Sequence, residues 1–198
     1  MKSNDKKFIN FVRKSLRDEG IGLFFRKVNW LMGDGCHCLG YFTDEKICIA
    51  TKNPRWIEVL AHEYSHFIQW KVGSSLYRKC FGPTNNYADV VDGWVKGKKY
   101  STSRVKRAFE TYRAMERECE RITVSVLLEH GVNFDVERYA QEANCNVYMY
   151  HFMESQKVRN FRKNPYARSI LTKMPSSFRV QSHRTIPKSV EHILSGCI

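Results

Sequence analysis

The sequence has no run of about 18 apolar residues, which is the length that a membrane-spanning helix needs. Residues 1–7 are polar, and Asn10, Arg13 and Lys14 interrupt the apolar residues that follow them. The start of the chain therefore lacks the apolar core of a secretory signal. From these two absences we expect a cytoplasmic protein with no membrane partner.

The cysteines have none of the regular spacing of a disulfide framework, because the seven are odd in number and scattered between residues 36 and 197. We expect reduced thiols that pack as small apolar side chains. Cys36, His37 and Cys38 are metal-binding residue types, but no second cysteine pair completes a structural zinc site. The default interpretation of this run is a strand with two packed thiols.

Acidic residues are scarce, with 20 Asp and Glu against 33 Lys and Arg, which gives a formal net charge of +13. This surplus suits contact with a polyanion, nucleic acid first, or simply a solvated basic surface. It is largest from residue 155 onward, where nine basic residues accompany one acid. Phe161, Tyr166 and Phe178 lie among these arginines. They suit stacking on bases or packing of the segment onto the domain, and we favour packing.

The length of 198 residues allows one core and is short for two. Apolar periodicity predicts a helix over residues 5–19, and β-branched and aromatic segments predict a small, mostly antiparallel sheet from residues 22–28, 40–42 and 47–50. Further helices are expected over residues 54–72, 87–94, 103–130 and 135–157, with an irregular excursion over 73–103. The class is α+β, with one domain over 1–157 and a basic segment over 158–198.

The most informative stretch is the helix segment around residues 59–68, which contains two histidines four residues apart. His62 and His66 lie on one helix face, so both imidazoles can bind a single zinc ion. Glu63 is offset around the helix, where it can reach a zinc-bound water and accept its proton as general base. The plainer alternative is a helix with two hydrogen-bonded histidines, but the uncharged flanks favour a buried active-site helix.

A catalytic zinc keeps three protein ligands, so a third must come from another element. The predicted helix over 103–130 contains four acids near its middle, Glu110, Glu116, Glu118 and Glu120. Its apolar stripe places Glu110 on the far side. Periodicity does not choose among the other three and mildly favours Glu116.

The His-Glu-Tyr-Ser-His run at 62–66 resembles the active-site helix of the zincin metallopeptidases. This resemblance implies a zincin-like domain, one Zn²⁺, peptide-bond hydrolysis, His62 and His66 as ligands and Glu63 as the base. Gln69 and Val72 stand where the metzincin subgroup needs glycine and histidine, which excludes that subgroup.

The segment that begins with Glu118, Cys119 and Glu120 resembles the second motif of gluzincins of the ImmA/IrrE and M48 types, with Cys119 in the position of a small residue. The resemblance implies Glu118 as the third ligand, with Glu116 as the fallback. It also implies that Glu120 orients a ligand histidine. The 73–103 excursion makes the spacing between the two motifs longer than in the ImmA/IrrE type.

Two further roles are expected near the site. Tyr148, Tyr150 and His151 fall on one helix and are candidates for stabilising the oxyanion, or are core and surface aromatics. An extended substrate is expected to pair with an edge strand above the motif helix, supplied by residues 47–51 or 35–42.

The function expected from the sequence is zinc-dependent cleavage of a polypeptide substrate. One alternative is a zincin-fold regulatory or nucleic-acid-binding protein with little proteolysis. Another is a protease resembling the DNA-associated SprT type, since Gln69 and Trp70 follow the motif, although that type needs a third histidine that this chain lacks at a suitable place. A small effector, such as a phage protein acting on one host target, is a third.

Overall fold

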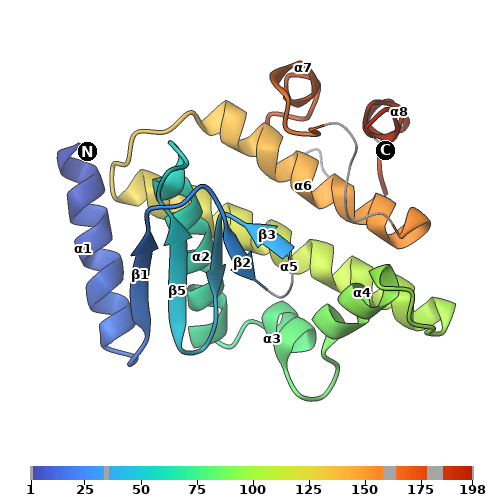
Figure 1. Cartoon of the computed structure of the whole chain (residues 1–198), viewed down its shortest axis with the longest axis horizontal. Helices are drawn as coiled ribbons and strands as arrows, with labels where there is room; N and C mark the ends of the chain where they lie inside the picture. The colour runs from blue at the N-terminus through green and yellow to red at the C-terminus, as the bar shows by residue number, and fades with distance from the viewer. Residues whose placement is uncertain (1, 34–35, 158–163, 178–184, 198) are drawn as a thin grey trace. The chain divides into compact units, whose positions relative to one another are not determined.

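The computed structural model describes residues 2–33, 36–157, 164–177 and 185–197, which form eight helices and five strands (Figure 1). The fold is mixed α+β with a mainly helical C-terminal half, as the sequence predicts. Contacts divide the chain into two compact units. Unit 1 comprises Met1–Gly73 and Cys119–Phe134, and unit 2 comprises Ser74–Glu118 and Asp135–Ile198.

The sheet of unit 1 has three strands in the order β1 (Gly22–Arg26), β5 (Lys46–Ala50) and β4 (Gly40–Phe42). β1 runs parallel to β5, and β4 runs antiparallel to it. A separate antiparallel ribbon joins β2 (Leu31–Gly33) to β3 (Cys36–Cys38). The prediction of a small sheet is confirmed, and with the ribbon counted two of the three strand pairings are antiparallel. The parallel pair arises because the ribbon and β4 lie between β1 and β5 in the chain, which supplies the connection that parallel strands need.

Two helices cover this sheet, α1 (Ser3–Arg17), which contacts β1, and α2 (Trp56–Lys71), which contacts β4 and β5 (Figure 1). The core of unit 1 forms from side chains on these elements and on the last turns of α5, among them Phe8, Leu16, Ile49, Leu60 and Leu127, all fully buried. Burying each such side chain contributes about 1.5–3 kcal/mol, so this core fixes α2 against the sheet.

The start of α2 differs from the prediction. The sequence predicts a helix from residue 54, but the helix begins at Trp56 with Arg55 as its N-cap. The Asn53 side chain accepts a hydrogen bond from the backbone N–H of Arg55 at 2.9 Å, which forms a turn before the helix. Gly73 follows the helix with a φ of +66°, the left-handed conformation expected of a glycine that ends a helix.

Unit 2 is helical in its described residues. Its helices are α3 (Ser75–Phe81), α4 (Tyr87–Val95), the first part of α5 (Thr102–Glu129), α6 (Val136–Gln156), α7 (Arg168–Leu171) and α8 (Lys188–Ser195). α3 was not predicted, whereas α4, α5 and α6 confirm the predicted helices. One core cluster joins α4 to α5 and another joins α6 to α7 and α8.

The described part of the basic C-terminal segment packs on α6, because Leu171, Met174, Val190 and Leu194 are buried in one cluster with α6 side chains. The Tyr166 hydroxyl donates a hydrogen bond to the Asn146 side chain at 3.2 Å. Phe161 and Phe178 lie outside the described residues. Within those residues, none of the helices combines the length and apolar character that a membrane crossing requires.

Candidate metal centre

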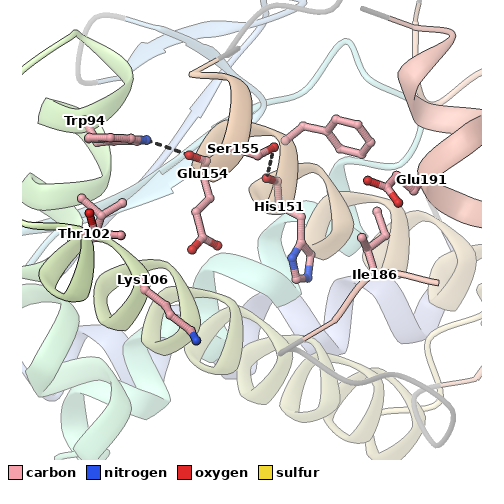
Figure 2. A pocket seen from close by; sticks show the side chains of 10 residues that line it. Trp94, Thr102, Lys106, His151, Glu154, Ser155, Ile186 and Glu191 are labelled. Atoms are coloured by element: carbon pink, nitrogen blue, oxygen red, sulfur yellow. Dashed lines mark hydrogen bonds between the residues drawn. The ribbon is translucent and has the colours of Figure 1, made fainter. Parts of the chain in front are cut away.

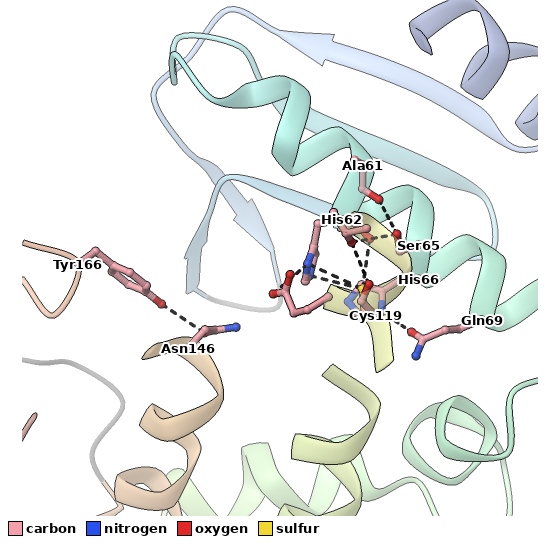
Figure 3. Close-up of polar contacts among 10 residues, drawn as sticks. Ala61, His62, Ser65, His66, Gln69, Cys119, Asn146 and Tyr166 are labelled. Atoms are coloured by element: carbon pink, nitrogen blue, oxygen red, sulfur yellow. Dashed lines mark hydrogen bonds and ion pairs between the residues drawn. The ribbon is translucent and has the colours of Figure 1, made fainter. Parts of the chain in front are cut away.

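The two motif histidines lie on α2 beside the last turns of α5. The His62 and His66 rings are 4.7 Å apart and perpendicular. Hydroxyl groups join the two helices at this level. Fully buried Ser65 donates a hydrogen bond to the Ala61 carbonyl at 2.7 Å and accepts one from Thr123 of α5 at 2.9 Å (Figure 3). With these bonds the hydroxyl groups of Ser65 and Thr123 both have hydrogen-bond partners, and the contact fixes the register of α5 on α2.

A third donor joins the histidines from α5. His62, His66 and Cys119 each offer one ligand atom, and these atoms all lie within 4.8 Å of one another (Figure 3). The Cys119 sulfur is 3.7 Å from His62 Nδ1 and 4.0 Å from Nε2. Two ligands of a tetrahedral zinc with bonds of about 2.0 and 2.3 Å lie roughly 3.6 Å apart. The group is therefore compatible with a bound metal ion.

Each histidine has a hydrogen-bond partner that selects its free nitrogen. Buried Gln69 places its amide oxygen 2.9 Å from His66 Nδ1, and buried Glu120 places a carboxylate oxygen 3.3 Å from His62 Nδ1. Both oxygens are acceptors, so each Nδ1 is assigned a proton and Nε2 is the ring nitrogen left for a metal. Histidines that bind metals usually have such partners, and the orienting role of Glu120 stays a prediction.

The charges of the two histidines differ. Burial, and then the charge of His62, lowers the pKa of His66 to about 3, although the Gln69 hydrogen bond opposes this shift. His66 is therefore neutral at physiological pH, the form that binds a metal. Burial also lowers the pKa of His62, but the neighbouring Cys119 and Glu120 outweigh it and raise this pKa well above its usual value. A metal cation bound to His62 would take the place of its second proton and would lie beside the same two groups, Cys119 and Glu120.

Glu63 is 8% exposed and lies beside this group. Burial raises the pKa of its carboxyl to about 7, against the lowering effect of His62, while Glu120 adds to the rise and a hydrogen bond from the Phe42 backbone opposes it. A carboxyl with a pKa near 7 can both accept and donate a proton near neutral pH. This raised pKa is compatible with Glu63 as the general base, a role that stays a prediction.

Strand β4 lies directly against α2 at Glu63. A Cβ added to Gly40 would come 2.8 Å from Val59 Cγ1 and 3.0 Å from Glu63 Cγ, so glycine permits this close approach. β4 is at one end of the sheet, whereas β5 is its central strand. The suggestion that residues 47–51 supply an edge strand for substrate is therefore wrong, because both sides of β5 are already paired. Residues 40–42 keep that role as a prediction, and Gly35 lies outside the described residues.

The acids of α5 are distributed around the helix. At about 100° per residue, Glu116 lies roughly 10° from the centre of the face shared by Cys119 and Glu120, and Glu118 lies roughly 150° from it. Glu116 is 5% exposed, and the Glu118 carboxylate accepts a hydrogen bond from Ser74 at 2.6 Å. Glu118 as a ligand stays a prediction, and the helix geometry favours the fallback, Glu116.

The three oxyanion candidates belong to unit 2. Tyr148 is fully buried in the core of α6, α7 and α8, and the Tyr150 ring lies 5.0 Å from the Tyr112 ring. His151 lines a cavity of about 400 Å³ together with Trp94, where Trp94 donates a hydrogen bond to the Glu154 carbonyl (Figure 2). Their role toward an oxyanion stays a prediction.

The sequence reasoning missed two participants, Cys119 as a donor and Gln69 as the partner of His66. Cys119 lies on the apolar stripe of its helix, which was a signal that its thiol points inward. Gln69 follows His66 by three residues, a spacing at which side chains meet on a helix.

Comparisons with protein-family models, curated proteins and solved structures gave no significant match to this chain. The resemblance to zincins is therefore one of motif, and the function has to be argued from the site itself.

Proposed function

We propose that this protein is a zinc-dependent hydrolase that cleaves peptide bonds. The convergence of His62, His66 and Cys119 beside the Glu63 carboxyl is the observation that supports this function. Structural zinc sites usually have four protein ligands, whereas catalytic sites have three and an open position for water or substrate. Three donors and a carboxyl with a pKa near 7 fit the catalytic kind.

Each of the site residues has a separate role in the proposed reaction. His62 and His66 would hold the zinc through Nε2, since Glu120 and Gln69 occupy their Nδ1 atoms. A bound zinc would supply Lewis-acid chemistry, lowering the pKa of water and polarising the substrate carbonyl. Glu63 takes the proton of the attacking water on its carboxylate and then passes it to the nitrogen of the leaving amine.

The third ligand in this scheme is Cys119, because its sulfur already lies in the donor group without any rearrangement. Glu116 is the competing assignment, since it shares that face of α5. The two differ in chemistry, because a thiolate is a softer ligand than a carboxylate. Spectroscopy of a substituted metal therefore separates them.

The test compares zinc content and proteolysis in Glu63→Gln, His66→Ala and wild type, with Glu45→Gln as an exposed control in the same unit. Wild type and Glu45→Gln should bind about one zinc per chain and cleave members of a broad peptide library. Glu63→Gln should keep the zinc and lose the cleavage, and His66→Ala should lose both. A wild-type protein that binds zinc and cleaves no peptide would refute the hydrolase and leave a binding protein.

A further inference from the structure

A second cavity, of about 290 Å³, lies in unit 2 and has a different character from the metal centre. Its lining residues are Thr84, Asn85, Tyr87, Ser103, Arg104 and Arg107. They come from the segment that leads into α4 and from the first turns of α5. The lining includes hydroxyl, amide and guanidinium groups and no carboxylate, so the two charges that it contains are both positive.

The two arginines have not been neutralised by acids. Within the described parts of the chain, neither Arg104 nor Arg107 forms an ion pair, and both side chains are exposed. Arg104 lies over the Tyr100 ring at 5.8 Å, a contact that leaves its N–H groups able to bind an anion. Two guanidinium groups three residues apart on a helix lie on one face, where both can reach one phosphate.

The sequence around the two arginines is rich in basic residues. Residues 95–107 contain six basic residues and no acid. One of these, Lys96, is paired with Asp92 at 2.7 Å, and another, Lys106, lines the cavity of about 400 Å³ instead, which leaves Lys98 and Lys99 besides the two arginines. A surface of this kind can neutralise several phosphates in a row, which a single small anion does not need.

We propose that this cavity binds a backbone phosphate of nucleic acid through Arg104 and Arg107, with Lys98 and Lys99 holding neighbouring phosphates. Arginine forks and hydroxyls recognise the phosphate oxygens, and the extended surplus distinguishes a nucleic acid strand from free phosphate or a phosphopeptide. The site uses none of the residues of the metal centre, so it does not depend on the proposed hydrolysis. Its contacts go to the backbone, so binding is expected to show little sequence preference.

The test is fluorescence anisotropy with a labelled single-stranded 20-mer of mixed sequence between 50 and 200 mM salt. Arg104→Ala/Arg107→Ala should bind at least ten-fold more weakly than wild type, and its salt slope should be smaller by about 1.4, the value for two lost contacts to a single strand. Lys6→Ala/Lys7→Ala removes the same charge from exposed positions of α1 and should change affinity less than three-fold. Circular dichroism should show all variants folded.

A conservative double variant distinguishes recognition by the guanidinium groups from attraction by positive charge alone. Arg104→Lys/Arg107→Lys keeps the charge, so it should keep the salt slope but regain only part of the affinity, because lysine lacks the guanidinium fork. Equal losses in the arginine and control double variants, full recovery with lysine, or wild-type binding without salt dependence would each overturn the proposal. So would binding of inorganic phosphate or a phosphopeptide by a wild type that does not bind the 20-mer.

Discussion

The buried contact between His62 Nδ1 and Glu120 Oε1 predicts that metal affinity depends on a residue that does not itself bind the metal. The two atoms are 3.3 Å apart, and the Glu120 side chain is only 6% exposed. At an effective dielectric constant of about 20, the Coulomb attraction between charges at this distance is about 5 kcal/mol, which is a ceiling because desolvation of Glu120 offsets part of it. Losses of such partners usually weaken metal binding about 10–100-fold, or about 1.4–2.7 kcal/mol.

The assay is competition for Zn²⁺ against a chromophoric chelator of known affinity. Glu120→Gln keeps an oxygen acceptor for His62 and loses the charge, so its zinc Kd should rise about ten-fold. Glu120→Ala loses both and should approach a hundred-fold rise. Glu129→Gln, an exposed acid on the same helix, should match wild type. Affinities of both Glu120 variants within two-fold of wild type would show that the carboxylate neither orients His62 nor stabilises the bound cation.

Three further outcomes are expected. With Co²⁺ in place of zinc, wild type should show a near-ultraviolet band from thiolate-to-metal charge transfer, and Cys119→Ser should lose it; a wild type without the band would exclude the thiolate as a ligand. Gly40→Ala should lower the free energy of unfolding by about 1–3 kcal/mol in urea titrations, because its Cβ would come 2.8 Å from a side-chain carbon of α2, whereas Gly196→Ala meets nothing closer than 3.5 Å and should change it far less. Burial raises the pKa of Cys80 and Cys145 from 9.0 to about 12. Between pH 9 and 12 the unfolded chain loses these protons and the folded chain keeps them, so stability falls with rising pH by up to about 1.4 kcal/mol per unit for each thiol. The Cys80→Ala/Cys145→Ala variant should show a correspondingly shallower decline, and an unchanged slope would contradict the buried neutral thiols.

Sequence reasoning succeeded where one helix decides the geometry. His62 and His66 lie on the same face of α2 whatever α2 packs against, because the spacing of four residues brings side chains together on any helix. The same local rule gave the long helices, since apolar periodicity over many residues is a strong signal. Helix α3, with seven residues between glycines, offered too few turns for that signal.

What the sequence left open depends on packing between distant segments. The parallel pairing of β1 with β5 joins residues more than 20 positions apart, and no local pattern specifies it. The contact of Glu120 with His62 and the place of Cys119 in the donor group follow from the register of α5 on α2. The buried pair of Ser65 and Thr123 helps to set that register.

The register of α5 on α2 also affects the choice between Glu118 and Glu116 as the predicted third ligand. The motif comparison favoured Glu118 and apolar periodicity mildly favoured Glu116, and both arguments lacked the direction from which α5 meets α2. Once Cys119 and Glu120 are seen against His62, a turn of 3.6 residues puts Glu116 on the same face and Glu118 on the other. The cobalt spectrum therefore decides between sulfur and the Glu116 carboxylate. In either case Glu63 keeps its place beside His62, because its position comes from α2 and from its contact with β4.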